Sequence, residues 1–314
     1  MRTFEAFPTM VTPLKWDNSV DYATVEKLTR WYWEQGCDGI FASCQSSEIW
    51  FLPEEDRVQL AQVVKDTADY LYENENPDAR PRMTVVASGH VSDDFDIQVR
   101  ELSRVAATNV DAVILITNRL DIANTSDEAW IADGKRLLES LPEHIHLGLY
   151  ECPYPYKRLL TPAMLKWAVS TGRFYFIKDT CCDAQEIDRR MDILRGSDIR
   201  LFNANAQTLY DSLKSGAAGY CGVMANFHPA LYVWLTKHMD DPKAREVADW
   251  LSIAAFTEQL AYPVTAKYHL SAVEGLPIGL NTLSRAPEQL TPYHKMCVEQ
   301  MNRSAVLLLE SIGE

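Results

Sequence analysis

The stretch RFYFIKDTCCD (residues 173–183) joins a short apolar run to a polar loop. The run RFYFIK (173–178) is rich in aromatic and branched side chains, as buried parallel strands are. Lys178 ends the run, and the loop DTCCD follows it. The sequence therefore predicts a buried strand that presents a lysine at its carboxyl end.

Seven further runs of this kind occur along the chain. They are AFPTMV (6–11), DGIFAS (38–43), RMTVVAS (82–88), DAVILIT (111–117), HLGLY (146–150), IRLFN (199–203) and AAGYCGV (217–223). Amphipathic helical patterns separate them, as in VDYATVEKLTRWYWEQG (20–36) and SDEAWIADGKRLLESL (126–141), where Ser126 can cap the helix. Eight β–α units in about 240 residues predict an α/β chain folded as a (β/α)₈ TIM barrel.

The two segments expected are a barrel over 1–241 and a C-terminal helical extension over 242–314, with a proline-containing connection at 284–292. A doubly wound open sheet is the alternative fold. No G-x-G-x-x-G or G-x-x-x-x-G-K-[ST] motif follows any of the strands, which argues against nucleotide binding.

Composition excludes several classes of protein. The net charge of −14, without a Lys- or Arg-rich stretch, argues against nucleic acid as a partner. No apolar run is long enough to span a membrane, and the N-terminus lacks the apolar region of a secretory signal. The seven cysteines match no disulfide framework, which indicates reduced thiols and a cytoplasmic location. No His or carboxylate cluster has ligand spacing, so we expect no metal and no cofactor.

Two strand ends carry candidate catalytic residues. Active sites of (β/α)₈ barrels lie at the carboxyl ends of the strands, where we place Lys178 and Tyr150. A lysine buried among phenylalanines deprotonates more easily, and a neutral amine is what attack on a ketone requires. Tyr150 ends the preceding strand and could pass protons across the barrel mouth. The alternatives are a lysine that leaves the strand for solvent and a tyrosine that only packs on a loop.

The loop SCQSSE (43–48) follows the second strand and concentrates polar groups. Gln45, Ser46 and Ser47 supply an amide, hydroxyls and backbone N–H groups that can hold a carboxylate without a metal. The alternative is a simple turn and cap before the next helix, because serine is a common turn residue. We expect Glu48 to brace this loop rather than react.

Several motifs together resemble the dihydrodipicolinate synthase and N-acetylneuraminate lyase family of class I aldolases, nearly from end to end. They are VTPL (11–14), GCDGIFASCQSSEIWFLPEEDR (36–57), VVASGH (85–90), GLYECP (148–153), IKDTCCD (177–183), GAAGYCGVMANFHP (216–229) and PVTAKYHLSAVEGLPIG (263–279). The resemblance implies that Lys178 is the Schiff-base lysine and Tyr150 the proton-relay tyrosine. It also implies a pyruvate-like 2-oxo acid substrate and a homo-oligomer, expected to be a tetramer.

The chain departs from the family where a second substrate would bind. The family's G-T-T-G is here Cys44 to Ser47, so that Gln45 replaces the first Thr and Ser46 keeps a hydroxyl at the second. Pro155 stands where the synthases have a substrate-binding Arg, and Leu120 stands near a Tyr that the synthases contribute from a neighbouring subunit. The resemblance therefore implies a pyruvate site without the aldehyde site of a lysine-biosynthetic synthase.

The function expected is a lyase that cleaves or forms a carbon–carbon bond in a hydroxy-2-oxo acid. A dehydratase or hydratase-aldolase that uses the same imine is the alternative, and an inactive 2-oxo acid sensor is the alternative of another class. We also assign Asn203 and Gly222 to substrate binding. The second substrate stays open, with candidate lining residues in the later loops: Tyr154, Tyr156, Lys157, Arg158, Asn203 and Asn205.

Overall fold

The computed structural model describes residues 4–76 and 78–313. The strands are β1 (Glu5–Pro8), β2 (Gly39–Ser43), β3 (Thr84–Ala87), β4 (Ala112–Ile116), β5 (Leu147–Tyr150), β6 (Phe174–Asp179), β7 (Arg200–Asn203) and β8 (Gly219–Gly222). The helices that alternate with them are α1 (Tyr22–Glu34), α2 (Glu54–Asn74), α3 (Phe95–Ala106), α4 (Asp127–Ser140), α5 (Pro162–Thr171), α6 (Ala184–Leu194), α7 (Ala206–Ser215) and α8 (Pro229–Lys237).

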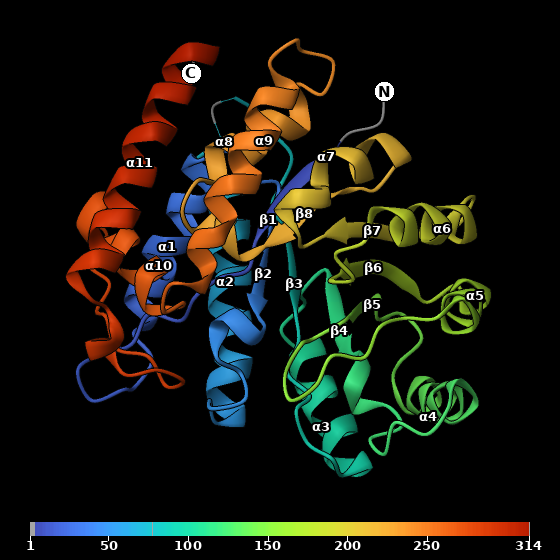
Figure 1. Cartoon of the computed structure of the whole chain (residues 1–314). Helices are drawn as coiled ribbons and strands as arrows, with labels where there is room; N and C mark the ends of the chain where they lie inside the picture. Colours follow the sequence, from blue (N-terminus) through green and yellow to red (C-terminus); the bar gives the residue numbers. More distant parts are fainter. Residues whose placement is uncertain (1–3, 77, 314) are drawn as a thin grey trace.

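The strands form one parallel sheet in the order β1-β8-β7-β6-β5-β4-β3-β2 (Figure 1). A parallel bridge between Thr9 and Phe41 joins the two edge strands just beyond β1. The Met10 amide donates to the Phe41 carbonyl at 3.1 Å beside it. The predicted (β/α)₈ barrel is therefore confirmed, and the open-sheet alternative is wrong.

Local sequence signals explain where helices begin. The Ser126 side chain accepts a hydrogen bond from the Ala129 amide at 3.1 Å, so Ser126 caps α4 as predicted. Asp94 and Asp183 cap α3 and α6 in the same way. Pro53 precedes α2 as its N-cap residue. Acidic residues follow it, where they favour the positive end of the helix dipole.

Aromatic rings fill the barrel interior. The Phe202 ring lies 4.7 Å from that of Phe7 and 4.6 Å from that of Phe176, measured between centroids. Gly39 leaves room for this layer, because a Cβ atom there would lie 2.2 Å from the Phe7 ring. One of these rings, Phe176, lies on β6 two residues before Lys178. The rings therefore close the barrel beneath its carboxyl-terminal mouth.

The C-terminal segment packs on the barrel as a group of helices. It contains α9 (Ala244–Ala254), α10 (Val264–Tyr268) and α11 (Pro292–Ile312), with the short helical turns η4 (Ala255–Gln259), η5 (His269–Val273) and η6 (Pro287–Gln289) between them. Val298 and Leu308 of α11 share one hydrophobic cluster with Leu28 of α1. Within residues 4–76 and 78–313, no helix combines the length and apolar character needed to cross a membrane.

Candidate active site

Lys178 and Tyr150 lie side by side on neighbouring strands. The parallel register pairs Tyr150 of β5 with Lys178 of β6, so the tyrosine is next to the lysine and not across the barrel mouth. Lys178 Nζ lies 4.3 Å from the centroid of the Tyr150 ring and 5.5 Å from that of Phe41. Both side chains are 3% exposed. Lys178 therefore points inward at the mouth and does not leave the strand for solvent.

Burial controls the protonation of Tyr150. The pKa of its phenol is raised well above the usual value, first because burial disfavours the phenolate and then because the Cys152 thiol lies nearby. The hydroxyl is therefore protonated at neutral pH and can act first as a proton donor.

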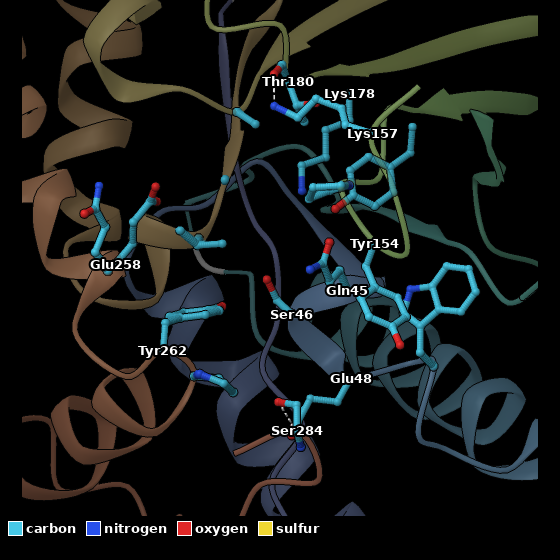
Figure 2. A pocket seen from close by; sticks show the side chains of 18 of the residues that line it. Gln45, Ser46, Glu48, Tyr154, Lys157, Lys178, Thr180, Glu258, Tyr262 and Ser284 are labelled. Atoms are coloured by element: carbon cyan, nitrogen blue, oxygen red, sulfur yellow. Dashed lines mark hydrogen bonds between the residues drawn. The ribbon is translucent and has the colours of Figure 1, made fainter. Parts of the chain in front are cut away.

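A cavity of about 690 Å³ opens at this end of the barrel (Figure 2). Its walls come from the loops after several strands and from the C-terminal segment. Its lining residues include Gln45, Ser46, Glu48, Trp50, Phe51, Tyr150, Tyr154, Lys157, Lys178, Asn205, Gly222, Glu258, Tyr262, Ser284 and Arg285. The structure thus brings the predicted catalytic pair into one cavity with Gln45, Ser46 and Gly222.

The two serines after β2 have different surroundings. Ser46 lines the cavity, and its hydroxyl donates to Thr9 Oγ1 at 3.0 Å. Ser47 is fully buried, and its hydroxyl lies 2.7 Å from the Met10 carbonyl oxygen and 2.9 Å from that of Ala42. The structure therefore leaves Ser46 facing the cavity, whereas the Ser47 side chain holds the loop against the barrel and is not part of the lining.

Glu48 braces this loop, as expected from the sequence. It has a left-handed backbone conformation with φ of 62°. Its Oε1 accepts hydrogen bonds from the amides of Leu283 and Ser284 at 2.8 and 2.7 Å. Its Oε2 lies 3.8 Å from the buried ammonium group of Lys267. Desolvation lowers the pKa of Lys267 to about 8, although the Glu48 charge acts in the opposite direction.

Asn203 does not reach the cavity. Its Nδ2 donates to Thr208 Oγ1 at 2.9 Å and to Ser212 Oγ at 3.1 Å, and its Oδ1 accepts from the Asn205 amide. These contacts fix the turn between β7 and α7, so the side chain is part of the scaffold. Gly222 does line the cavity, and a Cβ atom there would lie 2.3 Å from the Tyr220 hydroxyl.

A buried charge cluster links the carboxyl ends of β5 and β6 to helix α6. The Arg190 guanidinium of α6 binds the carboxylates of Glu151, at 2.8 Å, and Asp179. Glu151 also accepts from the amides of Leu160 and Thr180. Burial and the Asp179 charge raise the pKa of Glu151 to about 7, while Arg190 opposes that shift. Glu151 follows Tyr150 and Asp179 follows Lys178, so this cluster fixes the backbone next to the predicted catalytic pair.

Aromatic side chains form one wall of the cavity. The Tyr154 ring lies 5.2 Å from the Trp50 ring and 6.2 Å from the Phe51 ring, between centroids. Lys157 Nζ lies in the same cavity and donates to the Thr180 carbonyl at 2.8 Å. Tyr154, Lys157 and Asn205 thus line the cavity as the sequence allowed. Tyr156 and Arg158 are not among the lining residues.

The opposite wall comes from the C-terminal segment, which sequence reasoning did not connect with the site. Glu258 and Tyr262 both face the cavity from there (Figure 2). Partial desolvation raises the pKa of Glu258, and the positive charge of Lys178 lowers it. No strand-end position marks these two residues in the sequence. Within the described ranges, no group of three or more His, Cys, Asp or Glu side chains is arranged to hold a metal ion.

Comparisons with known proteins show which proteins this chain is similar to. No protein-family model matches the chain. The 4-hydroxy-tetrahydrodipicolinate synthase of Bifidobacterium longum is 29% identical over 109 residues, which is 35% of this chain and 32% of that protein. The match thus spans about a third of that relative. The synthase of Saccharophagus degradans is 23% identical over 311 residues, covering 95% of this chain and 97% of that protein. The resemblance to the dihydrodipicolinate synthase family is confirmed.

A solved structure agrees with the family resemblance. A prophage protein of the dihydrodipicolinic acid synthase family from E. coli K12, determined in complex with pyruvate, superimposes with a TM-score of 0.78. It is 20% identical, and the match covers 98% of both chains. At that identity the likeness establishes the shared fold. The chain therefore has the fold of dihydrodipicolinate synthase family lyases along nearly its whole length.

Proposed function

We propose that the chain is a Schiff-base-forming lyase that acts on pyruvate or another 2-oxo acid. The observation that carries the proposal is the buried Lys178 beside Tyr150 at the mouth of the barrel. Lys178 attacks the ketone carbon, and the carbinolamine loses water to give an imine. The protonated imine then accepts the electron pair of the bond that breaks at the neighbouring carbon.

Tyr150 transfers the protons in these reaction steps. Its neutral hydroxyl donates a proton to the departing carbinolamine oxygen, and the resulting phenolate takes a proton from the substrate hydroxyl during cleavage. The turn at Gln45 and Ser46 holds the substrate carboxylate with its hydroxyl, amide and backbone groups. Every group in this scheme lines the same cavity.

The walls of the cavity limit the chemistry of the second substrate. The wall of Trp50, Phe51 and Tyr154 suits a flat or apolar aldehyde. Pro155, where the synthases have an Arg, cannot bind a carboxylate with its side chain. We therefore propose that aspartate semialdehyde is a poor substrate. A panel of aldehydes incubated with pyruvate and read by product mass tests this, and enzymatic rates with aspartate semialdehyde would contradict it.

Trapping of the imine tests the central proposal. Incubation with pyruvate and borohydride should add one reduced pyruvate adduct, and peptide mapping should place it on Lys178. Lys178→Ala should abolish both adduct and turnover, because loss of a covalent nucleophile costs orders of magnitude in rate. Lys157→Ala is the matched control, since that lysine lines the same cavity and should leave the adduct at Lys178. An adduct on another lysine would overturn the proposal.

Product analysis separates the remaining alternatives. Release of free pyruvate from a hydroxy-2-oxo acid supports an aldolase, and loss of water without pyruvate supports a dehydratase. An imine without turnover of any hydroxy-2-oxo acid favours a sensor.

A further inference from the structure

The hydroxyl of Tyr262 lies in the cavity and belongs to none of the steps above. Tyr262 stands between η4 and α10 in the C-terminal segment. Figure 2 shows its hydroxyl pointing toward the hydroxyl of Ser46, which follows β2. Two segments separated by more than 200 residues thus present hydroxyl groups to the same part of the cavity.

The Asn226 side chain lies within hydrogen-bond distance of the Tyr262 hydroxyl, and its orientation shows whether it can accept the Tyr262 proton. Asn226 Oδ1 accepts from the Tyr32 hydroxyl at 2.6 Å. Its Nδ2 lies 2.8 Å from the carbonyl oxygens of both Thr9 and Val223. Because only the NH₂ side of an amide can donate to two carbonyls, these contacts fix the orientation of the amide.

The same Nδ2 lies 3.4 Å from the Tyr262 oxygen. An amide nitrogen cannot accept a hydrogen bond, so Asn226 does not take up the Tyr262 proton. That proton is free to donate into the cavity, on the side where Ser46 lies.

Glu48 keeps the two hydroxyl-bearing segments together. It lies two residues after Ser46 and pairs with Lys267 of α10, the helix that follows Tyr262. Its carboxylate also accepts hydrogen bonds from the amides of Leu283 and Ser284, which follow α10 and η5 in the chain. The position of Tyr262 relative to Ser46 is thus set by buried contacts.

The chemistry of a 2-oxo acid indicates which ligand group this donor meets. In the proposed reaction Lys178 bonds to the ketone carbon, and the carboxylate is attached directly to that carbon. Ser46 and Tyr262 line the same cavity as Lys178, so their hydroxyl groups are available to the carboxylate. Hydrogen bonds from neutral donors to a carboxylate are stronger than those to neutral acceptors.

We propose that Tyr262 is a substrate-binding residue whose hydroxyl donates to the carboxylate of the 2-oxo acid attached to Lys178. The inference rests on the proposed function and adds to it a residue from outside the barrel. It implies that the C-terminal segment completes the site for the oxo acid within a single chain.

The test measures whether the Tyr262 hydroxyl recognises the negative charge of the carboxylate. Borohydride trapping at Lys178 is followed against the concentration of pyruvate and of methyl pyruvate, whose ester is uncharged. Tyr262→Phe should raise the pyruvate concentration for half-maximal trapping by roughly 10–100-fold, the worth of a hydrogen bond to a charged group. The corresponding value for methyl pyruvate should change several-fold less. The parent's preference for pyruvate therefore shrinks in the variant.

Tyr268→Phe is the matched control, because the Tyr268 hydroxyl binds Glu299 outside the cavity and its loss should leave both values unchanged. Equal weakening of both ligands in Tyr262→Phe would mean a merely structural role and would overturn the inference. So would an unchanged preference for pyruvate. Absence of any adduct in the parent protein would overturn the proposed function, and this inference with it.

Discussion

At the scale of single residues, burial keeps the Tyr150 hydroxyl protonated, as its proposed role requires. Because desolvation raises its pKa, the hydroxyl stays neutral over the ordinary range of pH. Tyr150→Phe keeps the ring that packs against Phe41 and removes only the oxygen. We expect a folded protein with slow imine formation and turnover reduced by roughly 10²–10⁴-fold, the usual contribution of a positioned acid–base group. Stopped-time borohydride trapping follows imine formation, a product assay follows turnover, and circular dichroism checks that the fold is intact.

The same measurements can contradict the proposed role of Tyr150. If Tyr150→Phe traps pyruvate and turns over at the parent rate, Tyr150 is a packing residue. The Ser46 hydroxyl, which lies in the same cavity, would then be the next candidate for proton transfer.

The pair Lys178 and Tyr150 could be predicted from the sequence, whereas residues that approach from the C-terminal segment could not. Lys178 and Tyr150 each end an apolar run, and the carboxyl ends of parallel strands meet at one mouth. Ser47 shows the limit of this reasoning, because the turn after β2 directs its hydroxyl to backbone carbonyls and not to the cavity. Glu258 and Tyr262 reach the site only through tertiary packing of the C-terminal segment.

At the scale of elements, each of the eight predicted strands overlaps an observed one. Buried parallel strands are continuous apolar runs, which makes them easy to distinguish from the amphipathic helices between them. The C-terminal helices were predicted only as a group. Short pieces such as α10 and η5 have five residues each, too few to show a helical period. Their packing against the loop after β2 depends on the Glu48–Lys267 pair, which no local pattern reveals.

The buried charge cluster that links β5 and β6 to α6 depends on Arg190. Arg190→Met keeps most of the apolar stem but leaves the carboxylates of Glu151 and Asp179 buried without their cation. Breaking a buried ion pair in this way typically costs about 3–5 kcal/mol. We therefore expect urea unfolding to show a loss of that order in the free energy of unfolding. Arg189→Met is the control, because Arg189 is exposed and its pair with Glu186 contributes at most about 1 kcal/mol. An equal free energy of unfolding for the two variants would mean that the charge cluster does not stabilise the fold.

At the scale of the whole molecule, the apolar surface bears on the expected assembly. The tail AVLLLESI (305–312) has two possible roles in the sequence, packing on its own barrel or binding another subunit. In the structure one face of this helix packs on the protein and the other faces solvent: Ala305 and Leu308 are buried, while Leu307 is 65% exposed. Ile253 of α9 is likewise 71% exposed. Large apolar side chains in water are unfavourable when they gather in patches, and a subunit contact would remove them from solvent.

We therefore predict a homo-oligomer, with a tetramer as the expected form. Light scattering on the purified protein at micromolar concentration should give a mass four times the 35.7 kDa of one chain. Leu307→Glu together with Ile253→Glu should lower that mass if α9 and α11 form the contact, because burying two unpaired carboxylates opposes association. Imine trapping at Lys178 should persist in the dissociated protein, since Lys178, Tyr150 and Ser46 line one cavity of the single chain. A monomeric parent protein would contradict the assembly, and loss of trapping on dissociation would show that a neighbouring subunit contributes to the site.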